Sequence, residues 1–196
     1  SNQVSGCAFP ALQSEESSFC FLPILWNYGG SLAQIDSPAG RQAFGFLKQL
    51  AENRALSEDN VNMTISDIAW EFANGNIAMA FMTSSYENEI RKENPDLHFA
   101  TTKLPCGENS ITISGGEVLT VTCAEHEKEA REFVRFMEQP EQTEVYLDSM
   151  GYLAARRDLL KKQIQTDPAK KTYWSYLKQA KFREIEPYWP SLSMEV

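Results

Sequence analysis

The feature that most constrains the fold is a fixed order of segments in the middle of the chain. Residues 70–80 (WEFANGNIAMA) have the pattern of a helix end, a glycine turn and a short apolar run. Residues 104–107 (LPCG) carry a turn signal, and residues 114–121 (SGGEVLTV) place two glycines before a β-rich apolar run. Residues 127–137 are amphipathic at helical spacing. Short strands that alternate with helices predict an α/β fold.

Capping signals and glycines mark further elements. Ser37-Pro38 combines an N-cap residue with proline at the first helical position. The aromatic run at 19–28 predicts a helix that Gly29-Gly30 ends, with Pro23 inside it. The other expected strands lie over 4–13, 77–82, 99–104 and 118–123, with a turn at 105–109 and a loop over 182–196. The other expected helices lie over 65–72, 86–92, 126–138, 141–150, 153–164 and 170–179. Ser66 is the expected cap of the helix over 65–72, which Gly75 ends, and Gly151 ends the helix over 141–150.

Composition narrows the classes of partner. The net charge of -9 argues against nucleic acid and anionic membrane surfaces, because both are bound through clustered Lys and Arg. A hydrophobic fraction of 42% is sufficient for a core. The chain holds 11 Phe, 7 Tyr and 4 Trp, most of which we expect in the core and some as stacking surfaces. No apolar run reaches the length of about 18 residues that spans a membrane.

Cysteine and histidine do not predict a metal site or a cofactor. The cysteines are Cys7, Cys20, Cys106 and Cys123, and none forms a Cys-x-x-Cys pair. His98 and His126 lie too far apart in sequence to complete a metal set. In an exported protein, Cys106 and Cys123 are placed to pair across the intervening segment. The alternative is four small buried hydrophobic side chains.

The order and spacing of these segments resemble the second half of an extracellular solute-binding protein of an ABC importer. The resemblance is to the sugar-binding type, which includes maltose-binding proteins, and it covers nearly the whole chain. It attaches to residues 19–30, 72–79, 104–105, 115–117, 151–158 and 184–190. The implied fold is α/β and periplasmic-binding-protein-like (type II), with a second lobe and a helix-rich part of the first lobe.

The resemblance also implies a division of the chain. Residues 4–104 correspond to the second lobe, 105–152 to the returning part of the first lobe, and 153–196 to second-lobe helices and a cleft loop. Ser1-Asn2 has the look of a cloning scar, and the rest of the first lobe is expected ahead of it. Without sheet partners, a strand at 118–123 would expose unpaired N–H and C=O groups. We expect it to pair with a second copy or to pack differently, although a full-length protein is expected to be a monomer.

The function implied is capture of a sugar or oligosaccharide in a cleft between lobes and its delivery to an ABC permease. The location implied is periplasmic or extracellular, with a lipid anchor as one form of attachment. Alternatives are a ligand-sensing domain of the same fold, or a binder of a polyamine, iron or phosphonate. An enzyme is not expected. The sequence has no Gly-x-Ser-x-Gly, phosphate loop or Cys/His pair, and the acids Glu15-Glu16 and Glu58-Asp59 are better explained by solvation.

A sugar site needs aromatic faces for stacking and polar groups for hydroxyls. The candidate ligand-binding residues, placed by the resemblance, are Phe19, Tyr28, Ser85, Tyr86, Gly115, Gly116, Glu117 and Trp189. Glycine suits a close approach of backbone to ligand because it has no side chain. Each candidate has a structural alternative: core packing for the aromatic residues, turns for the glycines and solvation for Glu117. For Trp189 that alternative is a cap over the core.

Overall fold

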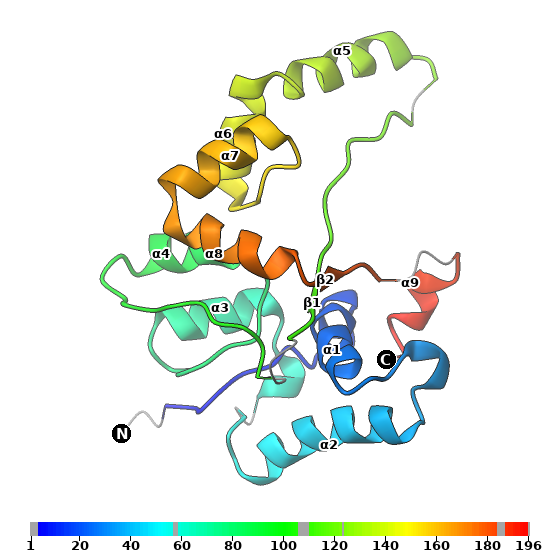
Figure 1. Ribbon diagram of the computed structural model, residues 1–196, viewed down its shortest axis with the longest axis vertical. Coiled ribbons are helices and arrows are strands. Elements are labelled where there is room, and N and C mark those ends of the chain that lie inside the picture. The colour runs from blue at the N-terminus through cyan, green and yellow to red at the C-terminus, as the bar shows by residue number, and fades with distance from the viewer. Residues whose placement is uncertain (1–3, 57–58, 106–109, 123, 184–186, 196) are drawn as a thin grey trace.

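A computed structural model describes residues 4–56, 59–105, 110–122, 124–183 and 187–195. Figure 1 shows a body that contains α1–α4 and α9, and an arm that contains α5–α8. The elements in chain order are α1 (Glu15–Asn27), η1 (Leu32–Gln34), α2 (Pro38–Glu52), η2 (Asn60–Asn62), α3 (Ile65–Ala73), α4 (Tyr86–Glu93), β1 (Thr112–Ile113), α5 (Glu127–Met137), α6 (Pro140–Met150), α7 (Arg157–Thr166), α8 (Pro168–Leu177), β2 (Ala180–Lys181) and α9 (Trp189–Leu192).

Helix α1 is the centre of the body. Its residues from 20 to 25 are all buried, and a helix that is apolar on every side is stable only inside a core. Ser14 caps it by accepting a hydrogen bond from the Ser17 N–H, and Gly29 ends it at a φ of +82°. The surrounding core cluster contains Phe9, Cys20, Phe21, Leu22, Ile24, Leu25, Ala43, Ile65 and Trp189. The predicted helix over 19–28 is confirmed.

Side-chain caps fix the starts of two further helices. Ser37 accepts a hydrogen bond from the Gly40 N–H at 3.2 Å, which confirms the predicted cap of α2. Helix α3 is capped by Thr64 rather than by Ser66, so that part of the prediction was wrong. Thr64 and Asp67 form a reciprocal capping box, with hydrogen bonds of 3.1 and 2.9 Å between side chains and backbone N–H groups.

Regular strands are few and short in the described chain. Strands β1 and β2 pair in parallel, with Thr112 opposite Ala180. The predicted strands over 4–13 and 77–82 are linked by isolated parallel bridges, Ser5 to Ile77 and Ala8 to Ala80, instead of a ladder. These bridges hold the N-terminal segment against the body.

Two predicted strands were wrong. Residues 99–104 are irregular, and so are the described residues of 118–123. Val118 is 83% exposed and Leu119 is 58% exposed, and no strand of the described chain pairs with this segment. In Figure 1 the segment after β1 runs alone to α5. Pairing with a second copy stays a prediction.

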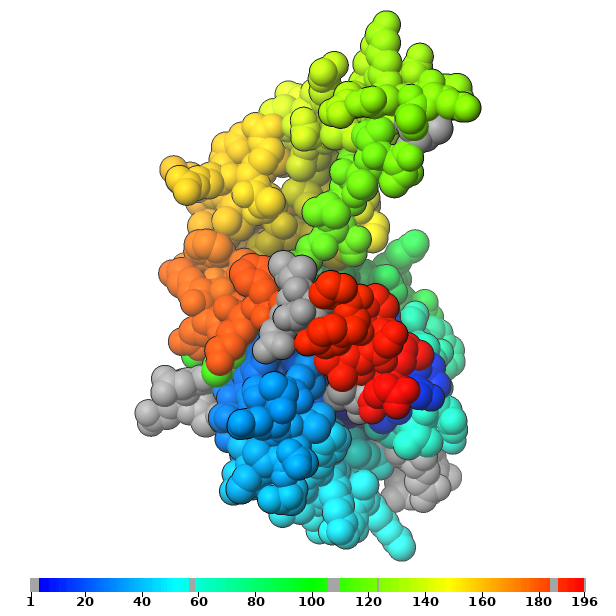
Figure 2. All heavy atoms as spheres, turned by 90° about the vertical axis from the view of Figure 1, so that its right-hand side faces the viewer, coloured from blue at the N-terminus to red at the C-terminus, as the bar shows by residue number. Residues whose placement is uncertain are grey.

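The helices of the arm agree with the sequence more closely. Helices α5 and α8 lie within about two residues of their expected ranges, and α6 ends at Gly151, which has a φ of +72°. Helix α7 begins at Arg157 instead of Leu153. The expected C-terminal loop contains the short helix α9, and Figure 2 shows this end of the chain lying against the α1 side of the body.

The described cysteines are buried thiols. Burial raises the pKa of Cys7 and raises the pKa of Cys20 to about 12, so both behave as small hydrophobic side chains. The predicted pairing of Cys106 with Cys123 lies outside the described residues. Within the described residues, no helix is long and apolar enough to cross a membrane and no group of side chains has the composition of a metal site.

Candidate functional site

Two of the candidate residues meet where the body faces the segment after β1. Phe19 projects from α1, and a Cβ atom at Gly115 would lie 3.3 Å from Phe19 Cε2. The chain therefore approaches this aromatic ring closely at a residue without a side chain. Asn27, at the end of α1, fixes the approach because its amide bonds both the N–H and the C=O of Ile111, at 2.8 and 2.7 Å. Gly116 faces open space.

Tyr86 lies beside the same part of α1. It is the first residue of α4, half-buried, and packs against the α1 core cluster. Burial, together with the nearby Glu16, Glu89 and Tyr152, raises the pKa of Tyr86 to about 12. The hydroxyl therefore stays protonated at neutral pH and can donate a hydrogen bond.

Tyr152 joins the candidate residues from the arm. It follows α6 in sequence, and burial together with the nearby Glu117 carboxylate raises its pKa. Its ring lies 6.5 Å from that of Tyr146 in an edge-to-face arrangement. The set of Phe19, Tyr86, Gly115, Gly116, Glu117 and Tyr152 is called the junction cluster below. It combines aromatic faces, hydroxyl groups, a carboxylate and accessible backbone.

A tight contact positions the two tyrosines. A Cβ atom at Gly151 would lie 2.9 Å from the carbonyl oxygen of Ser85, so the end of α6 meets the start of α4. The residues that follow these two positions are Tyr152 and Tyr86. Lys170 of α8 is buried and donates a hydrogen bond to the Gly151 carbonyl, which holds this turn in place. The Ser85 hydroxyl forms a hydrogen bond of 2.8 Å with the Thr83 hydroxyl.

The polar contact between α4 and α8 supports the same junction. Glu87 is buried and accepts hydrogen bonds from the Arg91 guanidinium, at 2.9 and 2.6 Å, and from the Tyr173 hydroxyl. Burial, followed by the Glu87 contact, raises the pKa of Tyr173. Thr101 lies 3.0 Å from the same hydroxyl. One hydrogen bond to a charged group, from Tyr173 to Glu87, therefore joins the arm to the body.

The other two candidates lie apart from the junction cluster. Tyr28 is nine residues after Phe19, about 13 Å along α1, and is 39% exposed. Trp189 is only 6% exposed and is part of the α1 core cluster. Its indole N–H donates to Glu15 at 2.9 Å, and Arg183 lies 5.0 Å above the ring. This placement agrees with the alternative role for Trp189, a cap over the core.

Sequence reasoning missed Tyr146 and Tyr152. Tyr152 lies in a segment that carries the family resemblance, directly after the helix-ending Gly151. The available signal was the position of this tyrosine, directly after a glycine that ends a helix. Tyr146 gave no signal of its own, since its position depends on the packing of Tyr152.

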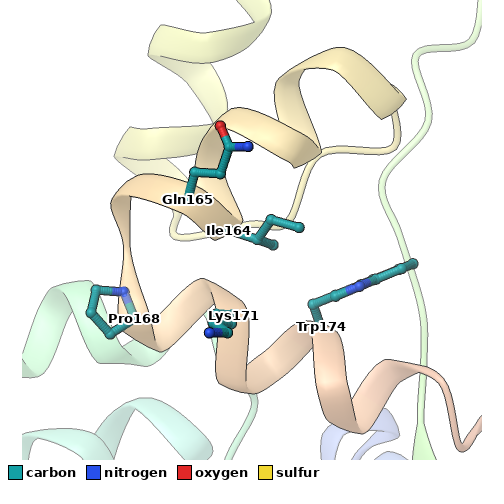
Figure 3. Close-up of a pocket in the computed structure, with 5 residues that line it drawn as sticks. All are labelled: Ile164, Gln165, Pro168, Lys171 and Trp174. Atoms are coloured by element: carbon teal, nitrogen blue, oxygen red, sulfur yellow. The ribbon is translucent and has the colours of Figure 1, made fainter.

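A hollow lies elsewhere, between α7 and α8. Its volume is about 530 Å³, and its lining residues come from both helices, as Figure 3 shows. They are Ile164, Gln165, Pro168, Lys171 and Trp174. A second hollow of about 300 Å³ lies between the segment after Phe9 and the C-terminal residues. The junction cluster is a surface between body and arm, rather than a closed cavity.

The body and the helical arm of this chain meet at an aromatic surface. Residues 3–172 match the family described as bacterial extracellular solute-binding protein. The chain belongs to this family. The sequence expectation of a solute-binding fold is thereby confirmed.

Individual relatives agree with this assignment. The chain is 19% identical over 188 residues to proteins named "Putative binding protein" from Brucella abortus and Brucella suis. Its structure is similar to that of maltose-bound MalE3 of T. maritima, with a TM-score of 0.80 and 17% identity over 97% of this chain. This similarity confirms the periplasmic-binding-protein-like fold. The chain spans 46% of the length of the Brucella relatives and 53% of MalE3.

Proposed function

We propose that this protein is the solute-binding component of an ABC importer and takes a sugar or oligosaccharide at the junction cluster. The observation that carries the proposal is that Phe19 of the body meets Gly115, while Tyr152 of the arm lies near both Tyr86 and Glu117. Sugars present apolar C–H faces and many hydroxyls, and this cluster offers groups for both. The similarity to MalE3, which is maltose-bound in its structure, supports the ligand class.

Each residue has a distinct role in the proposed site. Phe19 and Tyr86 supply stacking faces, and Glu117 accepts hydrogen bonds from sugar hydroxyls. Proline has no N–H, so Pro23 leaves the Phe19 carbonyl without its usual helical donor and adds an acceptor beside the ring. Ser85 orients the start of α4, and Trp189 acts indirectly, by holding α1 through Glu15. Tyr28 contacts a ligand only if that ligand extends along α1.

The proposed division of the chain follows the resemblance. Residues 4–104 and 153–196 form second-lobe parts, and 105–152 return from the first lobe. A ligand that binds residues of both parts stabilises the arrangement in which these residues lie close together. The size of this effect equals the difference in the ligand's binding free energy between the two arrangements. Closure of this kind is what a permease would recognise. We place the protein in the periplasm or outside the cell, with a lipid anchor as one means of attachment.

This is a binding role and not an enzymatic one. Glycoside hydrolysis needs two carboxylates across the scissile bond, on rigid elements. Glu117 is exposed on an irregular segment, and Glu16 accepts a hydrogen bond from the Ile65 N–H at 3.3 Å. A ligand-sensing domain remains the second candidate, because it would use the same site without a permease.

The test is a thermal-shift panel of saccharides that includes maltose and maltotriose, with spermidine and Fe³⁺ as controls, followed by calorimetric titration of the best ligand. We expect stabilisation by a saccharide. Removing one aromatic ring of the junction cluster, in Tyr86→Ala or Tyr152→Ala, should weaken binding about tenfold. Tyr28→Ala is the matched control and should keep the parental affinity for a short sugar.

Other outcomes have definite meanings. A shift with spermidine or iron alone would keep the fold and replace the ligand class. Hydrolysis of a saccharide during the titration would reject the non-enzymatic role. Equal losses of saccharide affinity in Tyr28→Ala and Tyr86→Ala would show that the binding site is not the junction cluster.

A further inference from the structure

Charge is strongly segregated along the chain. Residues 153–183 contain nine of the 18 Lys and Arg residues and only two acidic residues, within a protein whose net charge is -9. This segment forms α7 and α8. Charge separated in this way produces a local positive field on a molecule that is otherwise acidic.

Lys171 lines the α7–α8 hollow, and two further lysines lie within about one helical turn of its lining residues, whereas Lys162 pairs with Glu144. Lys161 is three residues before Ile164 on α7, and Lys171, Trp174 and Lys178 follow one another at helical spacing along α8. Lys161, Lys171 and Lys178 are exposed. Within the part of the chain that the structure describes, no carboxylate lies within ion-pair distance of any of the three. Their charges are available to a ligand.

The floor of the hollow is apolar and aromatic. Trp174 is half-buried, and Lys178 lies 5.8 Å from its ring centroid. Ile164 and Pro168 add aliphatic surface, and Figure 3 shows that the lining side chains come from both helices. A basic surface that served only for solubility would not need an indole at its centre. A volume of about 530 Å³ falls within the range of about 300–1,000 Å³ typical of small-ligand sites.

We propose that the α7–α8 hollow is a second binding site, for an acidic oligosaccharide such as a uronic acid oligomer. The indole of Trp174 stacks on a sugar ring, and Lys171 with its neighbours pairs with the carboxylates. The charge of the segment selects an anion, and the flat ring with a compact hollow selects a saccharide over an extended acidic peptide. This site is separate from the junction cluster and independent of the function proposed there.

The test is calorimetric titration of the 196-residue chain with trigalacturonate, using maltotriose as the neutral ligand of equal length and hexaglutamate as the acidic peptide. Trigalacturonate should bind, with an affinity that falls as NaCl is raised. Trp174→Ala should weaken it about tenfold, and Trp174→Phe should retain most of the affinity and the fold. Lys171→Gln and Lys178→Gln should each lower the affinity for trigalacturonate by about twofold to fivefold.

Two controls separate this site from the other proposal. Lys48→Gln removes an exposed lysine of α2 that already pairs with Glu52, and it should leave trigalacturonate binding unchanged. Tyr86→Ala should also leave it unchanged, whatever that variant does to neutral sugars. A loss of trigalacturonate binding in Tyr86→Ala would place the acidic sugar in the junction cluster and overturn the proposal.

Three further results would also overturn it. The first is an absence of trigalacturonate binding at every salt concentration. Hexaglutamate could bind as tightly as trigalacturonate and be unaffected by Trp174→Ala, which would leave only a non-specific basic surface. Self-association of the chain that is lost in Lys171→Gln would show instead that the acidic body of a second copy covers this face.

Discussion

The body and the arm of this chain are stabilised in different ways. In the body, α1 is enclosed by its neighbours, and Leu25 and Ile24 are fully buried. In the arm, α5 has no buried residue, and the core there consists of Leu147, Ala154 and Leu159. The arm is fixed instead by polar contacts to α4 and by the β1–β2 pair. The difference shows that the body has a large core of its own, whereas the arm has a small one and depends also on contacts made outside it.

The largest expected effect tests the enclosed core directly. Leu25→Ala removes a fully buried side chain and should lower the free energy of unfolding by about 2–5 kcal/mol. Phe133→Ala is its counterpart in the arm, where the ring is 56% exposed, and should change stability by less than about 0.5 kcal/mol. Urea unfolding followed by circular dichroism measures both. Similar losses in the two variants would mean that α5 is covered in solution.

The next effect concerns the turn that joins arm to body. Gly151→Ala places a Cβ at a φ of +72° and 2.9 Å from the Ser85 carbonyl oxygen, so it should cost about 2–4 kcal/mol. Gly45→Ala is the control, because a Cβ there meets nothing within 4 Å in the middle of α2. It should stabilise by about 0.4–1 kcal/mol. A tolerated Gly151→Ala would show that α6 does not meet α4 this closely.

A smaller effect is expected at the polar joint. Tyr173→Phe removes a hydrogen bond to the buried Glu87 carboxylate and should cost about 1–3 kcal/mol. Tyr176→Phe, on the same helix, is the control, since its hydroxyl makes no hydrogen bond within the described residues. Hydrogen exchange should show faster opening of α8 in Tyr173→Phe alone. Unchanged exchange in both variants would contradict the polar joint.

The smallest effect compares a capped helix with an uncapped one. Helix α3 has the Thr64–Asp67 capping box, whereas α5 starts at His126 without a side-chain cap. Asp67→Ala should cost about 0.5–1 kcal/mol at pH 6. Hydrogen bonds from Thr64 lower the pKa of Asp67, so its contribution is fully present above the unfolded value of about 3.9 and is lost as pH falls through the lower folded value. Thermal melts at pH 6 and pH 2.5 measure this change, and a cost independent of pH would contradict it.

The sequence predicted the helices better than the strands, for a physical reason. Ser37-Pro38 and Gly151 act within a few residues of themselves, so their signals are visible locally. Residues 118–123 have the β-rich composition of a strand, but a strand also needs a neighbour, and the described chain offers none there. Thr64 was missed as a cap because Ser66 is equally suited by residue type, and only the position of Asp67 distinguishes them.

The candidate site could be predicted only in part. The resemblance located Phe19, Tyr86 and the glycines 115–116, and the structure brings Phe19 to Gly115. It also named Trp189, whose aromatic character suits a sugar site and a core equally well. Burial against Glu15 is a long-range contact that no local pattern shows. Tyr152 was missed for the same reason, since its nearness to Tyr86 depends on the close meeting of α6 and α4.

The central claim, that saccharide binds where the arm meets the body, is tested most directly by NMR. Backbone and aromatic resonances of the chain would be followed while the best saccharide of the panel is added. We predict that the shifts concentrate on Phe19, Tyr86, Tyr152 and residues 115–117, while Trp189 is unaffected. Shifts confined to Trp189 and Tyr28, or no specific shifts with any saccharide, would contradict the account.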